Sequence, residues 1–243
     1  MIPGFSILYL LFSSWQTLGS LLAKTKEKQQ KKSLTSHLQL DEVSLIVPFR
    51  NEAPRVHELL KCLKNSSTLP CEIIFINDHS TDNSVDLVNN YLNNKAINYK
   101  VFSLSNDKVG KKAAIRLGVK NSSINSKFIL TFDADIIFNE YYFENLKQLP
   151  ESDLFIFPVK MEGKTILEHL YALDYNLLYI INRIAFGFKR PILASGANLL
   201  FNKKSFLKWD SFNSHKHLSS GDDMFLLNDF IKGGSFNRSI LQQ

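Results

Sequence analysis

The chain has 243 residues, of which 44% are hydrophobic and 21% charged, and this composition suits one sizeable α/β domain or two small ones. Its ten glycines and seven prolines form no repeat, which excludes collagen-like, mucin-like and solenoid proteins. The net charge of +6 is concentrated in residues 24–32, where five lysines accompany one glutamate, so the nearly neutral remainder argues against a nucleic-acid-binding face.

Residues 2–23 contain no charged side chain. As a helix they would be about 33 Å long, close to the hydrocarbon thickness of a bilayer. We therefore expect a membrane anchor at residues 1–23, followed by a basic polar tether at residues 24–41. Because serine, threonine and glutamine side chains interrupt the apolar run, an interfacial helix is the alternative to a transmembrane one.

The position of the lysines predicts the orientation of the chain. They follow the apolar run, whereas a cleaved signal peptide carries its positive charge before it. Lysines immediately after a span mark the cytoplasmic side. The two cysteines, Cys62 and Cys71, are too few for a disulfide framework and lack the companions of a zinc site, which fits a reduced compartment. We expect a single-pass protein of the cell (inner) membrane with its body in the cytoplasm.

After the tether, the body at residues 42–243 alternates between short apolar segments and helical patterns. The predicted strands are Val43–Phe49, Glu72–Asn77, Lys100–Leu104, Lys127–Phe132, Asp153–Val159 and Leu199–Asn202. Helical patterns begin at Pro54, at a Ser80 or Thr81 cap, at Lys111, at Thr165 and at Gly221. Apolar strands separated by helices predict an α/β fold, with an open, mostly parallel sheet flanked by helices.

The helix predicted from Thr165 to Gly187 carries tyrosines at every fourth position, Tyr171, Tyr175 and Tyr179. This spacing places the three rings on one face. We interpret the stripe as core packing or as contact with a membrane, in preference to a ligand-binding role.

Polar side chains follow several of the predicted strands. They are Arg50, Asn51 and Glu52 after the first strand, Asp78 after the second, Lys111 and Lys112 after Gly110, and Asp133 and Asp135 after the fourth. Ligands of open α/β sheets bind at the carboxyl ends of the strands. The sequence therefore predicts a site at this edge.

Asp133 and Asp135 flank one small residue directly after a buried strand. Two carboxylates on such a turn can face one Mg²⁺ or Mn²⁺, which commonly also binds substrate phosphates. A solvated turn or a helix cap is the alternative for an isolated Asp-x-Asp, but the position after KFILTF favours the metal site.

Two further positions suggest a nucleotide ligand. Asp78 is placed to accept a hydrogen bond from a ribose or a base edge, or else to form an Asx-turn. Lys111 and Lys112 begin a helix, where free N–H groups and the helix dipole favour a phosphate. A solvated helix face is the alternative for either lysine.

Asp222 and Asp223 begin the helix that follows Gly221. The helix dipole stabilises carboxylates at this position, which is sufficient to explain one of them. The other interpretation is a general base that removes a proton from an acceptor hydroxyl. His215 and His217 nearby are interpreted as residues of a polar surface loop.

Taken in order, six segments resemble the family-2 inverting glycosyltransferases of the GT-A fold, in a membrane-anchored, bacterial-type form. They are VSLIVPFRNE, EIIFINDHSTDNS, GKKAAIRLGV, FDAD, SGANLLF and SGDDMFLL, and they run from about Val43 to about Lys232. The resemblance implies metal-dependent transfer of a sugar, with inversion, from a nucleotide-diphosphate donor to an acceptor hydroxyl. A lipid-linked or glycan acceptor at the cytoplasmic membrane face would place the reaction in glycan or glycolipid synthesis.

The resemblance also implies a role for particular residues. The donor nucleotide is expected to bind at Pro48, Arg50, Asn51, Glu52, Asp78, Lys111 or Lys112, and Asp133. The metal, Mn²⁺ or Mg²⁺, is expected at Asp135 with Asp133, and the catalytic base is expected to be Asp223. The acceptor is expected to bind at Ser195, Gly196, Ala197, Asn198 and Asp222. Asp222 stands where the family carries a glutamate.

Two departures from the family pattern leave an alternative open. Neither Trp15 nor Trp209 belongs to a Gln-x-x-Arg-Trp motif, and the chain is C-terminally short after the Asp223 helix. The alternative is a truncated, inactive, membrane-anchored relic that binds only nucleotide or a partner, although the intact carboxylates argue against it. A sugar-nucleotide pyrophosphorylase is less favoured, because the loop PFRNEAP lacks glycine.

Overall fold

The computed structural model describes most of the body of the chain. The described residues are 37–93, 97–149, 151–161, 165–187, 194–209, 222–233 and 240–241. The predicted anchor at 1–23 and most of the tether at 24–41 lie outside them. Within the described part, no helix combines the length and the apolar character needed to cross a membrane.

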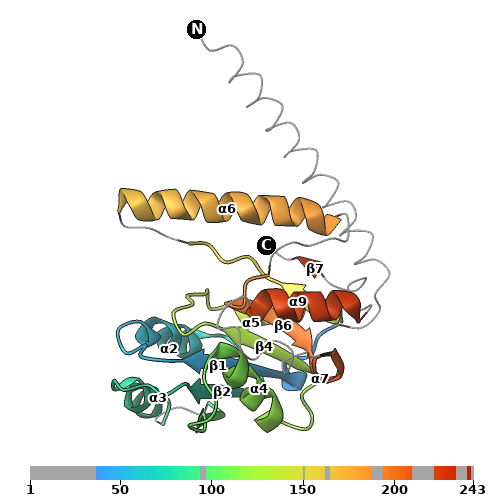
Figure 1. The fold of residues 1–243 in the computed structure, drawn as a ribbon. Coiled ribbons are helices and arrows are strands. Elements are labelled where there is room, and N and C mark those ends of the chain that lie inside the picture. The colour runs from blue at the N-terminus through green and yellow to red at the C-terminus, as the bar shows by residue number, and fades with distance from the viewer. Residues whose placement is uncertain are drawn as a thin grey trace, which may run out of the picture.

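A seven-stranded sheet in the order β3-β2-β1-β4-β6-β5-β7 forms the centre of the structure (Figure 1). The strands are β1 Val43–Phe49, β2 Glu72–Asn77, β3 Tyr99–Ser103, β4 Phe128–Phe132, β5 Leu154–Ile156, β6 Asn198–Asn202 and β7 Ile240–Leu241. Neighbouring strands from β3 to β4 are parallel, whereas β6 runs antiparallel to both β4 and β5. The open, mostly parallel sheet expected from the sequence is thus confirmed, with β6 as the reversed strand.

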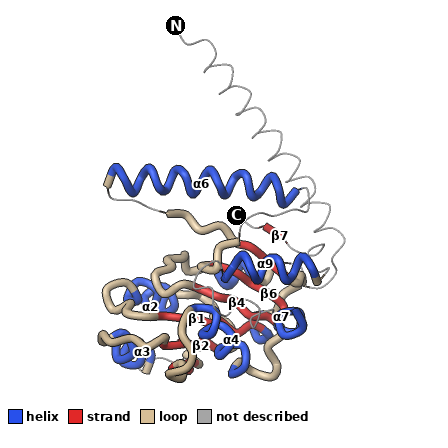
Figure 2. Tube along the Cα trace, viewed as in Figure 1, coloured by secondary structure: helices blue, strands red, loops and turns tan. Residues whose placement is uncertain are grey.

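Helices cover both faces of this sheet (Figure 2). The covering helices are α2 Val56–Asn65, α3 Ser84–Leu92, α4 Lys111–Asn121, α5 Tyr142–Leu146, α7 Lys203–Trp209 and α9 Asp222–Lys232. Helix α6, Ile166–Gly187, lies apart from the sheet (Figure 1), and a short 3₁₀ helix, η1, is formed at Leu40–Glu42. Successive β1 side chains enter opposite clusters: Leu45 and Val47 pack with α2, α3 and α5, and Ile46 packs with α4, α7 and α9. Both faces are buried, which explains the continuous apolar sequence of β1 and β2.

The second helix begins later than the sequence suggests. A cap at Ser80 or Thr81 was expected, but α3 begins at Ser84, whose backbone N–H donates to Asp82 Oδ1 at 3.1 Å. The Ser80 hydroxyl instead accepts a hydrogen bond from the Asn51 N–H at 3.0 Å. The cap prediction is therefore wrong, because these polar groups connect two loops. β5 is also shorter than the predicted Asp153–Val159.

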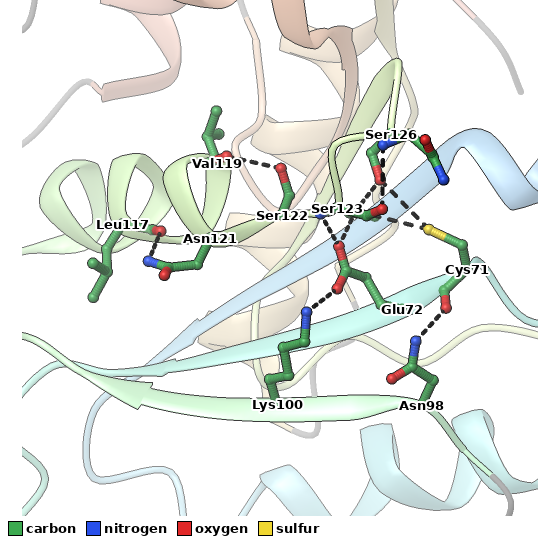
Figure 3. A network of polar contacts seen from close by, with 12 residues as sticks. Cys71, Glu72, Asn98, Lys100, Leu117, Val119, Asn121, Ser122, Ser123 and Ser126 are labelled. Atoms are coloured by element: carbon green, nitrogen blue, oxygen red, sulfur yellow. Dashed lines mark hydrogen bonds and ion pairs between the residues drawn. The ribbon is translucent and has the colours of Figure 1, made fainter.

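A buried polar network lies at the amino ends of the strands (Figure 3). The Glu72 side chain is 2% exposed, and its Oε1 accepts hydrogen bonds from the Ser44 hydroxyl at 2.7 Å and the Ser123 N–H at 2.5 Å. Its Oε2 pairs with Lys100 Nζ at 2.7 Å. Burial raises the pKa of Glu72, but the hydrogen bonds from Lys100, Ser44 and Ser123 outweigh it, so the net pKa lies below its ordinary value.

This network joins β1, β2, β3 and the turn after α4 through a single carboxylate. Ser44 and Ser126, both buried, bring their hydroxyl oxygens to 2.5 Å, so Ser126 can donate to Ser44 while Ser44 donates to Glu72. Lys203 Nζ donates to the carbonyls of Ser122 and Ser123 at 3.3 and 3.0 Å. Because the network lies at the edge opposite the predicted site, we interpret it as a structural element.

Candidate functional site

A pocket of about 270 Å³ lies at the carboxyl ends of β1, β2 and β4. Its lining consists of Pro48, Phe49, Arg50, Glu52, Asp78, Lys111, Asp133, Ala134 and Asp135. Most of the residues expected to bind a donor nucleotide and a metal therefore meet at one place, as the parallel arrangement of these strands requires. Asn51 and Lys112 do not belong to this lining.

The loops after β1 and β2 are connected by side-chain hydrogen bonds. Asn51 has a positive φ of 54°, a conformation that asparagine tolerates better than most residues. Its side-chain oxygen accepts a hydrogen bond from the Thr81 N–H at 2.8 Å. The Glu52 N–H donates to the Ser84 hydroxyl at 2.9 Å, and the Ala53 N–H donates to Asp82 Oδ2 at 3.0 Å. These bonds hold Glu52 at the pocket.

Asp78 is almost completely buried, with 7% of its surface exposed. Its Oδ2 accepts a hydrogen bond from the Gly110 N–H at 3.0 Å, whereas its Oδ1 has no hydrogen-bond partner among the described residues. A buried acceptor without a partner destabilises the folded state, so its presence at this pocket calls for an explanation. Gly110 has a φ of 98°, which favours glycine at this point of the loop.

Lys111 and Asp133 form an ion pair across the pocket, from the first turn of α4 to the end of β4. Both side chains are about one-third exposed, so the pair remains accessible to a ligand. Of the two lysines considered from the sequence, Lys111 is the one that lines the pocket. A phosphate there would meet both the lysine and the N-terminus of α4.

Glu52 and Asp135 are connected by Arg55, a residue that the sequence analysis did not single out. Its guanidinium binds Glu52 through two contacts of 2.8 Å, and its Nη1 lies 3.5 Å from Asp135 Oδ2. The pKa of Glu52 is raised by burial, and the neighbouring charges of Asp135 and Asp133 add to this effect, although Arg55 opposes it. The only signal in the sequence was a basic residue three positions after Glu52.

The described residues contain no group of three or more His, Cys, Asp or Glu side chains arranged around a metal position. Asp133 and Asp135 nevertheless contribute two carboxylates to one pocket. Mg²⁺ and Mn²⁺ prefer oxygen ligands, and Mg²⁺ commonly combines one or two carboxylates with waters and substrate phosphates. The residues present therefore fit a cation that is shared with a bound diphosphate.

The predicted acceptor segment, residues 195–198, lies beside the turn that carries Asp133 and Asp135. The Asp133 N–H donates to the Ala197 carbonyl at 3.3 Å. Asn198 begins β6, and its side-chain oxygen accepts a hydrogen bond of 2.6 Å from the hydroxyl of Tyr142. Burial raises the pKa of Tyr142 far above its ordinary value, so this hydroxyl remains a donor. The sequence did not predict this pairing.

The predicted helix at Asp222 is confirmed, since α9 runs from Asp222 to Lys232. It packs against the sheet through Leu227 and Phe230. The side chains of Asp222 and Asp223, together with His215 and His217, lie outside the described residues. The roles expected for these two carboxylates remain predictions.

The model of the family described as "Glycosyl transferase family 2" matches residues 44–206. A poly-beta-1,6-N-acetyl-D-glucosamine synthase of Staphylococcus epidermidis is 27% identical over 223 residues, which cover 86% of this chain and 53% of that protein. The chain thus spans about half the length of the curated relatives it matches.

Two solved structures share the fold. The mannosyltransferase PcManGT from Pyrobaculum calidifontis, in complex with GDP-Man and Mn²⁺, gives a TM-score of 0.63 at 15% identity, covering 96% of this chain and 65% of that one. Staphylococcus aureus TarS 1-349 in complex with UDP-GlcNAc gives a TM-score of 0.52 at 17% identity, and the match covers 83% of this chain and 56% of TarS 1-349. The expected GT-A architecture of the sheet is thereby confirmed.

Proposed function

The chain belongs to glycosyl transferase family 2, and we propose that it transfers a sugar from a nucleoside-diphosphate donor to an acceptor hydroxyl with inversion. The observation that carries this proposal is the pocket at the ends of β1, β2 and β4. A lysine and an Asp-x-Asp turn lie there together with a buried carboxylate oxygen that has no hydrogen-bond partner in the described part of the chain.

Each part of the pocket suits one part of a nucleotide sugar. Asp78 Oδ1 would accept a hydrogen bond from a base N–H, which would provide the partner that the oxygen lacks. Lys111, at the start of α4, would bind the diphosphate. Asp135 and Asp133 would hold a divalent cation, which supplies positive charge for the departing nucleoside diphosphate.

The acceptor side is proposed to lie at Ser195–Asn198, beside the turn that carries Asp133. Asp223, in the first turn of α9, would remove the proton from the acceptor hydroxyl. The oxygen would then attack the anomeric carbon from the face opposite the nucleotide. A single displacement of this kind inverts the configuration and needs no covalent enzyme intermediate.

The relatives suggest which donor to test first. One of them is named a poly-beta-1,6-N-acetyl-D-glucosamine synthase, and TarS has been solved with UDP-GlcNAc. We propose a UDP-linked N-acetylhexosamine as donor, and a glycan or a lipid-linked sugar as acceptor.

Donor binding is expected to require the metal. UDP-GlcNAc and GDP-mannose, each with and without Mn²⁺, would be added to the full chain in detergent and thermal unfolding recorded. A donor at a hundredfold excess over its Kd stabilises the folded state by about 2.7 kcal/mol. We expect a raised Tm only when donor and Mn²⁺ are both present, and no such rise for Asp135→Asn.

Asp86→Asn is the matched control, because Asp86 is an exposed carboxylate of α3 outside the pocket. It should behave as the wild type does. Cooperative melting without a shift from any nucleotide sugar would contradict the proposal and favour the inactive relic instead.

We also propose that the protein works at the cytoplasmic face of a membrane. The uncharged residues 2–23 and the lysines after them support an anchor. A second support is α6, which lies apart from the sheet (Figure 1). Its exposed large apolar residues are Ile166, Leu167, Leu170, Tyr171, Leu173, Leu177 and Leu178. Such a face suits the boundary between headgroups and acyl chains.

Deletion of residues 1–23 should move the protein from the membrane fraction to the soluble fraction, as measured by sedimentation with vesicles. Any binding that remains should be lost when Leu170→Glu and Leu177→Glu are added to α6. Ile124→Glu, at a residue 96% exposed elsewhere on the surface, controls for the added charge. A shortened chain that still sediments fully with the α6 substitutions would refute both membrane contacts.

A further inference from the structure

Arg55 lies next to the pocket, and the proposed reaction does not explain its role. It directly precedes α2 and is 58% exposed, so its side chain is free to adopt other positions. It instead pairs with Glu52, through a hydrogen bond of 2.8 Å from Nη2 to Oε1 and an ion-pair contact of 2.8 Å between Nε and Oε2. The third nitrogen, Nη1, lies 3.5 Å from Asp135 Oδ2. A hydrogen bond between two charged groups is stronger than one between neutral groups, so the pair with Glu52 favours this position of the guanidinium.

The lining of the pocket has more acidic than basic residues, which favours a cation there. Four acidic residues line the pocket, Glu52, Asp78, Asp133 and Asp135, together with two basic residues, Arg50 and Lys111. Lys111 pairs with Asp133, and Arg55 approaches Asp135. Asp135 is the residue expected to bind the divalent metal, so the Arg55 guanidinium and the metal would compete for the same carboxylate.

We propose that Arg55 competes with the metal for Asp135. Its guanidinium is held by Glu52 and neutralises the Asp135 carboxylate until a divalent cation displaces it from Asp135. This inference rests on the proposed function, because it takes Asp135 as a metal ligand. Mn²⁺ alone would bind weakly, because it must replace an existing counter-ion. A donor diphosphate brings further oxygen ligands and would favour the exchange, so cation and donor would bind cooperatively.

The proposal predicts the sign of a change in metal affinity. Mn²⁺ binding to the full chain in detergent, without donor, would be followed by the electron paramagnetic resonance signal of the free ion. We expect Arg55→Gln to bind Mn²⁺ about two- to fivefold more tightly than the wild type, since the competing pair is partly exposed and therefore modest in strength. A residue that only shaped the site would produce the opposite change when removed.

Two further variants distinguish an effect of the Arg55 charge on Mn²⁺ affinity from an effect of the altered structure. Arg55→Lys keeps the charge and should stay close to the wild-type affinity. Lys61→Gln removes one positive charge from an exposed position of α2 outside the pocket, and should change the affinity less than Arg55→Gln does. Tm values of all variants, measured without Mn²⁺, would establish that each is folded.

The outcomes for Arg55 and for the metal site can be told apart. Asp135→Asn should lose Mn²⁺ binding; if it binds Mn²⁺ as well as the wild type does, the cation is not at Asp135 and the metal-dependent function fails as well. If Asp135→Asn loses binding but Arg55→Gln shows unchanged or weaker affinity, the competitor role of Arg55 alone is refuted.

Discussion

Replacing Asp223 by asparagine is expected to lower the rate of sugar transfer by a factor of about 10² to 10⁴, the usual contribution of a general base. An amide keeps the shape of the side chain but cannot take up the acceptor proton. Donor binding should be unchanged, because the pocket is built from β1, β2, β4 and α4, whereas Asp223 belongs to α9. Transfer would be measured with a radiolabelled nucleotide sugar, and binding by thermal unfolding.

Asp222→Asn is the control that the chain itself offers. Both residues belong to the first turn of α9, so we expect the loss of either charge to remove a similar interaction with the helix dipole, about 0.3–1 kcal/mol. A purely structural effect would therefore be alike in the two variants. Asp222→Asn should impair transfer far less. If Asp222→Asn abolishes transfer and Asp223→Asn does not, the base is Asp222.

The first two strands could be predicted to the residue. β1 and β2 occupy the predicted ranges Val43–Phe49 and Glu72–Asn77, because strands buried on both faces leave a continuous apolar segment. The carboxyl-end rule then located the pocket without knowledge of the strand order. What the sequence did not contain was the direction of β6, since an antiparallel neighbour can be buried as completely as a parallel one.

The pairings inside the site were less accessible to sequence analysis. Asn51 was expected to face the nucleotide, yet its side-chain oxygen is used by the backbone of Thr81, thirty positions later. The contact of Arg55 with Asp135 likewise joins residues far apart in the sequence. A motif indicates which residue types reach the pocket, whereas hydrogen bonds between loops depend on how the loops pack. Helices α5 and α7 were missed because each is too short to show a helical period.

Replacing Glu72 by glutamine should lower the free energy of unfolding by about 2 kcal/mol at pH 7, the scale of a hydrogen bond to a charged group. Glutamine retains an oxygen for the Ser44 hydroxyl and the Ser123 N–H, but it turns an NH₂ group towards Lys100. Unfolding by urea, measured in detergent, would give the value. Glu144→Gln is the control, because Glu144 pairs with Lys147 at 2.6 Å on the surface, and such pairs contribute about 0–1 kcal/mol.

The difference in the free energy of unfolding between the wild type and Glu72→Gln should depend on pH, and this dependence tests whether the charge of Glu72 is responsible. Its pKa in the folded protein lies below the ordinary value of 4.5, because hydrogen bonds from Lys100, Ser44 and Ser123 outweigh the effect of burial. The stabilising contribution is therefore complete above pH 4.5 and is lost as the pH falls through the lower, folded-state value. The difference between wild type and Glu72→Gln should shrink in the same range, since a protonated carboxyl resembles the amide. If the wild type is still more stable than Glu72→Gln at the lowest pH, the shape of the Glu72 side chain, and not its charge, is what stabilises the network between β1, β2 and β3.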